Sequence, residues 1–449
     1  MQKIITKYGL AAHLALLAVA PLILSPSLVL WLSLIGLVWL LMQPSQIGRE
    51  YLHSARRRVA KAIVSDPFFW FLLGVVVYAA IRCANGGLGL SYDAEKAVWS
   101  LSTAACPILP AAADGCGFNE FAASVAMVVV VQGCRHALGK NARGGFLYAS
   151  SLISGAIAVT IAVSFACGSD WASRMVDITL AHPQFLGAIF AAYLIAGTVA
   201  LAFVIENAWY RAMPMMFFSI GGNLLGLFIF ALPGTQIVFV AAWMIIFLYV
   251  FSFLLKNVSG ASELKLIMMT VVSFGAAALV AVAVLPEKMI TERIDPWVEL
   301  AFVPEGFWEM RNALANVSLK TWLDNSWLGT GLGTLVHDIK FYATESDWQV
   351  LWQNHSMALN GYWQLLAERG IIGAAVFAVA LIFICWTYFR RLVRGILAQF
   401  PHPACWLGPI VVIAFAVEGY AFCSFLHPAA LIVIVSCMAI SANSFPKEK

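Results

Sequence analysis

The chain has 449 residues, of which 62% are hydrophobic and only 11% are charged. Soluble domains carry about 25% charged residues, so this composition excludes an ordinary soluble enzyme. The formal net charge of +4 is no signal for nucleic acid, and it is informative only when basic residues are sorted by membrane side. We therefore expect an all-α polytopic membrane protein.

Apolar stretches long enough to cross a bilayer recur along the whole chain, and we count twelve. The first two form a hairpin of spans around Pro26, and no clear small-residue cleavage site follows Lys3 and Lys7, so we expect no cleaved signal peptide. The predicted spans are residues 9–24, 27–42, 67–83, 119–134, 145–167, 185–205, 214–232, 237–255, 264–285, 370–389, 405–425 and 428–442.

Basic residues gather in alternate loops. Eighteen of the 27 Lys and Arg residues lie in the two termini and in the loops after the second, fourth, sixth, eighth and tenth spans. The positive-inside rule places these segments in the cytoplasm. The long segment 286–369 carries eleven acidic and six basic residues and belongs to the opposite side. The predicted organisation is nine spans in residues 1–285, an extracytoplasmic loop domain in 286–369 and three spans in 370–449.

Two cysteines lie in a polar loop, whereas most of the nine are within apolar stretches. Cys106 and Cys116 are ten residues apart and would form a disulfide if this loop faced an oxidising compartment. Two free thiols are the alternative, and the sequence leaves both open.

The large loop begins with a predicted helix at 305–325 that carries Arg311. Its helical neighbours in sequence include no acid, because the positions three and four residues away hold Phe307, Trp308, Leu314 and Ala315. Arg311 is then either a solvated or distantly paired residue, or a guanidinium directed at a phosphate, which its planar set of donors suits.

Glycines follow at alternate positions, Gly329, Gly331 and Gly333. This spacing is not the fingerprint of a nucleotide site, and no strand precedes it. Alternate glycines either form a plain tight turn or expose backbone amides to an anion.

A second helix is predicted to begin near His355, with Asn354 or Ser356 as its cap. A neutral imidazole at a helix N-terminus could take a proton from an attacking hydroxyl, although a capping or solvated His355 is the alternative. His337 is the competing histidine, and a solvated loop residue is its simpler interpretation. The sequence shows no metal-ligand spacing and no cofactor motif, so we expect neither.

The order of these motifs resembles the O-antigen ligase and O-antigen polymerase superfamily, bacterial inner-membrane enzymes that act on undecaprenyl-pyrophosphate-linked glycans. The resemblance is carried over 305–375 by an arginine, an aromatic residue, a glycine turn, a histidine and a Glu-x-Gly-x-x-Gly ending: Arg311, Trp322, Leu328 to Gly333, His355, and Leu366 to Gly373. His182-Pro183-Gln184-Phe185 is similar to a family His-Pro-Asn element. Twelve spans with a large periplasmic loop between the ninth and tenth look like the ligase branch.

The sequence also departs from the family pattern. Ser326 stands where the family has Pro, and Ser356 follows His355 where the family has Asn. Counted without a gap, the family His-Asn pair falls on Leu359-Asn360. The family places an Arg at the start of the eighth span, where this chain has Gln236, so Arg174 and Arg293 are candidates for a second cation.

The resemblance implies a metal-independent glycosyl transfer. His355 would activate an acceptor hydroxyl and Arg311 would stabilise the leaving pyrophosphate. The remaining predicted substrate-binding residues are Arg174, Arg293, Gln236, Gly331, Gly333 and His337. The implied partners are an undecaprenyl-pyrophosphate-linked donor, a lipid A-core or growing-glycan acceptor, and membrane lipids.

A ligase, a polymerase and a protein O-oligosaccharyltransferase of this superfamily share the donor and differ in the acceptor. Outside the class, a lipid-linked sugar transporter is the alternative. Transporters usually carry ionisable residues within their spans. Here Glu206 and Glu418 are the main ones expected, which favours an enzyme.

Overall fold

The structure is a computed structural model of the whole chain. It describes residues 2–41, 60–88, 90–93, 98–101, 106, 108–113, 115–166, 183–207, 209–230, 233–257, 305–351, 358, 360–396, 402–420 and 424–444. The ninth predicted span, 264–285, lies outside these residues.

The described residues are mostly helical, as the sequence predicts. Helices lie at the positions of the other eleven predicted spans. These helices are α1 (Gln2–Val19), α2 (Pro26–Leu41), α4 (Pro67–Ala84), α5 (Cys116–Gln132), α6 (Lys140–Ala166), α8 (Pro183–Glu206), α9 (Met213–Phe230), α10 (Pro233–Asn257), α16 (Gly361–Ile396), α17 (Ala404–Glu418) and α18 (Pro428–Ser444).

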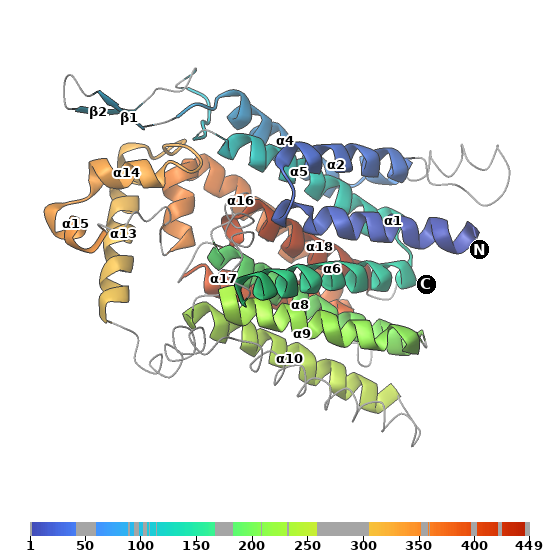
Figure 1. Ribbon diagram of the computed structural model, residues 1–449. Helices are drawn as coiled ribbons and strands as arrows, with labels where there is room; N and C mark the ends of the chain where they lie inside the picture. The colour runs from blue at the N-terminus through green and yellow to red at the C-terminus, as the bar shows by residue number, and fades with distance from the viewer. Residues whose placement is uncertain are drawn as a thin grey trace.

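A membrane protein is supported by length and hydropathy of the described helices. Six of them are long and apolar enough to cross a bilayer: α4, α5 with its extension to Ala137, α6, α8, α9 and α10. The apolar helices α1, α2, α17 and α18 are shorter. The start of α1 and the end of α18 lie toward the same end of the bundle (Figure 1).

The centre of the bundle is α8. Residues from Phe185 to Val204 are almost all buried, and Tyr193 donates a hydrogen bond to the carbonyl of Ala18 in α1. A helix that is apolar on every side is expected to be enclosed by others. Figure 1 shows α8 running beside α6, α9 and α10.

Small and polar side chains bring α6 and α9 together. Ser151 and Ser219 share a 2.6 Å hydrogen bond, and Ser154 donates to Asn223 Oδ1 at 2.8 Å. A Cβ at Gly155 would lie 2.6 Å from the carbonyl oxygen of Ser219, so only glycine allows this approach. Such contacts are typical of helices that pack within a membrane, where apolar burial alone gives little attraction.

The elements of the predicted loop gather at one end of the bundle. They are α13 (Glu305–Asp324), α14 (Leu335–Tyr342) and α15 (Glu345–Leu351), at the left of Figure 1. The helix predicted at 305–325 is confirmed, and its apolar residues Leu314 and Val317 are fully buried. The antiparallel hairpin of β1 (Leu90–Asp93) and β2 (Val98–Leu101), in register from Leu90 opposite Leu101, was not predicted.

The start of α16 corrects the predicted helix cap. Asn360 Oδ1 accepts the N–H groups of Tyr362 and Trp363 at 3.1 and 3.2 Å, so Asn360 caps the helix rather than Asn354 or Ser356. The cap lies later in the chain than predicted because α16 begins only at Gly361. Nine residues later, Gly370 takes φ 60° and ψ −170° and kinks the helix.

Candidate functional site

Three segments far apart in sequence meet where the bundle joins the loop elements. They are residues 111–113, 326–333 and 367–372, which we call the glycine junction. The amides of Thr330 and Gly331 donate to the carbonyls of Ala367 and Glu368 at 2.9 and 3.1 Å. In return, Ile371 and Ile372 donate to Ser326 and Trp327 at 2.8 and 3.1 Å. The third segment joins through Ala113, whose amide donates to the carbonyl of Leu332 at 2.8 Å.

Positive φ angles make this junction dependent on glycine. Gly329, Gly331, Gly333 and Gly370 have φ of 70°, 123°, 76° and 60°, a region that side chains with a Cβ rarely adopt. A Cβ at Gly329 would lie 2.5 Å from the carbonyl carbon of Glu368. The glycine turn and the Glu-x-Gly-x-x-Gly ending are therefore two halves of one contact.

The glycine turn holds a carboxyl group of the protein itself, that of Glu368, whose pKa is raised by burial. The Glu368 carboxylate accepts a hydrogen bond from the amide of Gly333 and another from Gln364 Nε2 at 3.0 Å. Glu368 is only 2% exposed. The amides of Gly331 and Gly333, predicted to bind substrate, are thus engaged by α16 in this arrangement.

Asp338 on α14 is a second buried carboxyl beside the junction. Its Oδ2 accepts hydrogen bonds from the hydroxyls of Thr330 at 2.8 Å and Thr334 at 3.2 Å. Burial raises the pKa of Asp338 to about 7; the Thr330 hydrogen bond opposes the rise and the Glu368 charge adds to it. The neighbouring His337 is half-buried, and burial together with the Lys340 charge lowers its pKa. His337 is therefore neutral at pH 7.

A buried charge network adjoins the junction on the bundle side. Glu120 in α5 pairs with Arg369 at 2.9 Å and with Arg82 of α4 at 3.3 Å. Arg82 is fully buried, and it also donates to the backbone carbonyls of Ala111 and Glu368 at 3.2 Å each. Two guanidinium groups thus face one carboxylate within the helix bundle.

This network corrects the expectation that Glu206 and Glu418 are the main ionisable residues of the spans. Arg82 and Glu120 lie inside predicted spans, each within a few residues of its end. The signal in the sequence is a pair of opposite charges at the facing ends of two consecutive antiparallel spans. The Glu418 carboxyl accepts a 2.6 Å hydrogen bond from Ser424, and Glu206 lies 3.2 Å from Lys140.

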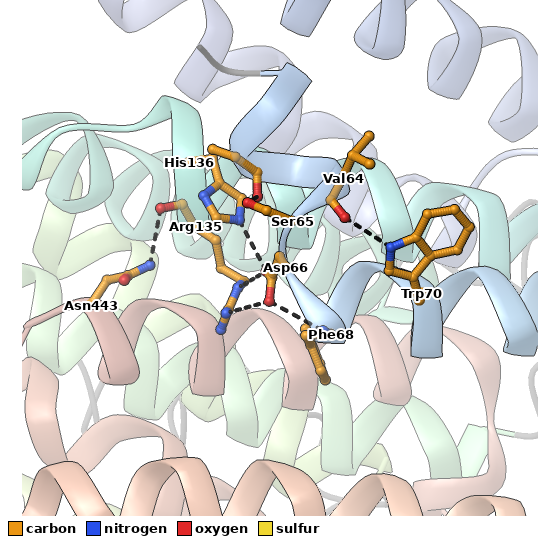
Figure 2. Close-up of polar contacts among 9 residues, drawn as sticks. Val64, Ser65, Asp66, Phe68, Trp70, Arg135, His136 and Asn443 are labelled. Carbon is orange, nitrogen blue, oxygen red and sulfur yellow. Dashed lines mark hydrogen bonds and ion pairs between the residues drawn. The ribbon is translucent and has the colours of Figure 1, made fainter.

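A separate cluster occupies the other end of the α4–α5 pair (Figure 2). Asp66 precedes α4, and the π-helical turn η2 (Gly133–Ala137) follows α5 and carries Arg135 and His136. Arg135 forms a two-pronged pair with Asp66 at 2.7 and 3.0 Å, and His136 Nε2 lies 3.0 Å from the same carboxylate. We call these three residues the Asp66 cluster.

The Asp66 cluster is closed by further contacts. Asp66 Oδ1 accepts the amide of Phe68 at 3.1 Å, and Asn443 of α18 donates to the carbonyl of Arg135 at 3.2 Å. Burial alone would raise the Asp66 pKa, but hydrogen bonds from His136 and Arg135 and the Arg135 charge lower it to about 2. This cluster fastens α4, η2 and α18 to one another.

Arg311 is buried in α13 and makes its contacts away from the junction. Its Nε and Nη2 donate to the carbonyl of Tyr420 at 3.3 and 2.9 Å, and its guanidinium lies 4.2 Å from the centre of the Tyr420 ring. Arg311 thereby joins α13 to the turn that follows α17. Because Arg311 is buried, it is not the solvated residue that the sequence offered as one alternative.

Gln236 stands in the first turn of α10 and is buried. Its Nε2 donates to the carbonyls of Leu227 and Phe228 at 3.2 and 3.0 Å, so it covers the end of α9. His355, Arg174 and Arg293 lie outside the described residues.

Cys106 and Cys116 are not joined by a disulfide in this structure. Among the described residues, no group of three or more His, Cys, Asp or Glu side chains is arranged to hold a metal ion. The chain matches no protein-family model and no curated protein. The family resemblance therefore rests on the order of the motifs alone.

Proposed function

We propose that this protein is a membrane glycosyltransferase that moves a glycan from an undecaprenyl-pyrophosphate carrier to an acceptor at the extracytoplasmic face of a bacterial inner membrane. The preferred acceptor is lipid A-core, as in an O-antigen ligase. A growing polysaccharide or a protein is the alternative acceptor within the class.

One observation carries this proposal. The glycine turn and the Glu-x-Gly-x-x-Gly ending, which carry the family resemblance, form a single interlocked contact through Thr330, Gly331 and Glu368. Motifs that matched by chance would have no reason to meet. The junction also brings Glu368 of α16, the helix that follows His355 in the sequence, against the buried guanidinium group of Arg82.

In the proposed reaction, the acceptor hydroxyl attacks the sugar carbon that bears the pyrophosphate. The bond between this carbon and the pyrophosphate oxygen breaks, and the lipid pyrophosphate leaves. His355 takes the hydroxyl proton. Arg311 is the proposed cation for the leaving group, for which its guanidinium must be shared with, or released from, the Tyr420 carbonyl.

The test is complementation of a deletion strain, read as surface polysaccharide on a gel. His355→Ala should abolish transfer, whereas His337→Ala should only reduce it, because His337 is a predicted substrate-binding residue and not the proposed base. Arg311→Ala should also abolish transfer, and Asn312→Ala, an exposed neighbour on the same helix, should not. Full activity of His355→Ala at normal protein levels would overturn the assignment.

Because Arg311 is buried, the amount and thermal stability of its variant must be measured beside its activity. An inactive Arg311→Ala protein of unchanged stability supports a role in transfer. An inactive and unstable Arg311→Ala protein assigns Arg311 a structural role, because the loss of its contact with Tyr420 then accounts for the loss of activity.

A lipid-linked sugar transporter is the second candidate, and the buried Arg82–Glu120–Arg369 network favours it, because ionisable residues within spans often mark transport pathways. Purified protein in detergent separates the two. An enzyme forms the glycosylated acceptor from lipid-linked donor in micelles. A transporter forms no new product there, because micelles have no two compartments between which a substrate could be moved.

A further inference from the structure

A groove runs between α4, α5, α16 and α18 beside the glycine junction. One wall is a face of α4 with Phe71, Val75 and Tyr78, and the other is a face of α16 with Arg369, Gly373 and Val376. These residues enclose a cavity of about 80 Å³ that opens to the surface, so the groove is narrow. Except for its end at Arg369, Glu120 and Tyr78, the lining is almost wholly apolar.

The polar end of the groove has donors in excess of acceptors. Arg369 and Arg82 both pair with the single carboxylate of Glu120, and the Arg82 guanidinium lies 5.3 Å from the centre of the Tyr78 ring. Glu368 is a further acid beside both arginines, and its carboxyl accepts hydrogen bonds from Gln364 and Gly333. This imbalance suits an added anion with several acceptor oxygens.

Two polar atoms at this end lack partners. Within the part of the chain that the structure describes, Arg369 Nε and Tyr78 Oη are buried and have no hydrogen-bond partner. Arg369 is 7% exposed. Buried polar groups are nearly always paired, so an unpaired donor beside a groove calls for a ligand or an ordered water.

The apolar wall continues onto the outer surface of the bundle. A second hollow shares Phe71 and Val376 with the groove and adds Ile371, Ile372 and Val379, of which both isoleucines are 42% exposed. A hydrocarbon chain in the bilayer can therefore pass from this surface into the groove. Gly373 keeps the groove open, because a Cβ there would lie 3.1 Å from Tyr78 Oη.

We propose that this groove binds a lipid phosphate with one long hydrocarbon chain, the phosphate lying at Arg369 and Tyr78 and the chain between α4 and α16. One hydrocarbon chain is proposed because the groove is narrow. The binding itself does not require glycosyl transfer. If the proposed function holds, the polyprenyl carrier is the natural occupant, and that identification rests on it.

Binding of undecaprenyl phosphate to the purified full chain in detergent micelles tests the proposal. We expect this probe to raise the unfolding temperature and to be retained in native mass spectrometry. Val376→Trp fills the groove and should weaken binding by about tenfold or more. Ile382→Trp is the matched control, because Ile382 is an exposed residue of the same helix that lines neither hollow. It should leave binding unchanged.

Tyr78→Phe removes only the hydroxyl and should weaken binding about tenfold, as expected for a hydrogen bond to a charged group. It keeps the proposal testable if Val376→Trp fails to fold. Phosphatidylglycerol has two hydrocarbon chains. If it stabilised the protein equally, the groove would be a site for ordinary bilayer lipids and the proposal would be overturned. If inorganic phosphate competed fully with undecaprenyl phosphate, the proposed role of the hydrocarbon chain in binding would be overturned. Failure of transfer with intact lipid binding would count against the proposed function alone.

Discussion

The two ends of the α4–α5 helix pair both bury an Arg–carboxylate contact, but they are built differently. The ends are separated by 16 residues of chain, or about 24 Å along a helix. In the Asp66 cluster one carboxylate takes two prongs of Arg135, a histidine and a backbone amide. At the glycine junction two arginines share Glu120, and Arg369 Nε lacks a partner among the described residues.

This difference distinguishes a structural contact between helices from a binding site. A closed set of hydrogen bonds fixes helices relative to one another and leaves nothing for a ligand. An open set beside a groove carries a stability cost that a ligand can offset. We therefore expect substitutions in the Asp66 cluster to change stability alone, and substitutions at the junction to change stability and lipid binding together.

The largest effect is expected from Gly370→Ala. A Cβ at Gly370 would collide with the carbonyl group of Trp327, and φ is 60°, so the junction must open. We expect a loss of about 4 kcal/mol or more, because the obstacle is backbone on both sides. Thermal unfolding in detergent measures it. Gly74→Ala is the matched control within α4, because nothing lies within 4 Å of its Cβ, and it should be neutral or slightly stabilising.

The next largest effect is expected from Asp66→Asn. Removing one partner of a buried ion pair leaves Arg135 uncompensated, at a cost of roughly 3–5 kcal/mol. Lipid binding and glycan transfer per folded molecule should be unchanged, because the Asp66 cluster lies at the far end of α4. If Asp66→Asn reduced the lipid affinity of the folded protein, the assignment of a structural role to the Asp66 end and of lipid binding to the opposite end of α4 would be wrong.

A smaller, pH-dependent effect is expected from Asp338→Asn. The folded-state pKa of about 7 lies above the ordinary 3.8, so the folded protein binds a proton that the unfolded chain releases. Stability from this carboxyl is fully present below about pH 4 and is lost as pH rises through 7. The amide introduced by Asp338→Asn has no proton to lose in this range, so the variant should lack this decline and exceed the parent by a few kcal/mol at pH 8, at about 1.4 kcal/mol for each pKa unit of the shift. Unfolding midpoints between pH 4 and 8 measure the difference, and parallel curves would contradict it.

Hydropathy was sufficient to predict the helices, because an apolar stretch of the right length indicates a buried or membrane-spanning helix without information from the rest of the chain. It could not give the glycine junction, because the backbone pairing of residues 111–113, 329–333 and 367–372 depends on contacts across the chain. The sequence also did not show that the amide of Gly333 contacts Glu368, because the two belong to separate motifs. Arg82 and Glu120 were missed because a charge within a turn of a span end resembles an ordinary boundary residue.

The helix cap was missed for a related reason. Asn354, Ser356 and Asn360 all have side chains that cap helices, and only the position of Gly361 in the folded chain decides among them. The cap at Asn360 coincides with the ungapped placement of the family His-Asn pair on Leu359-Asn360. That placement puts a leucine at the family histidine, so under the proposed function the base is a histidine outside the pair, and His355 is the one proposed.

The smallest effect on stability, and the sharpest on this question, is expected from Asn360→Ser. Serine also caps helices, so the start of α16 should hold with a loss of about 0.5 kcal/mol or less. If Asn360 acts only as a cap, transfer should be retained, and His355→Ala alone should abolish it. If Asn360→Ser abolished transfer at unchanged stability, the amide itself would take part in the reaction. The catalytic residues would then follow the ungapped placement, and His355 would lose its assigned role.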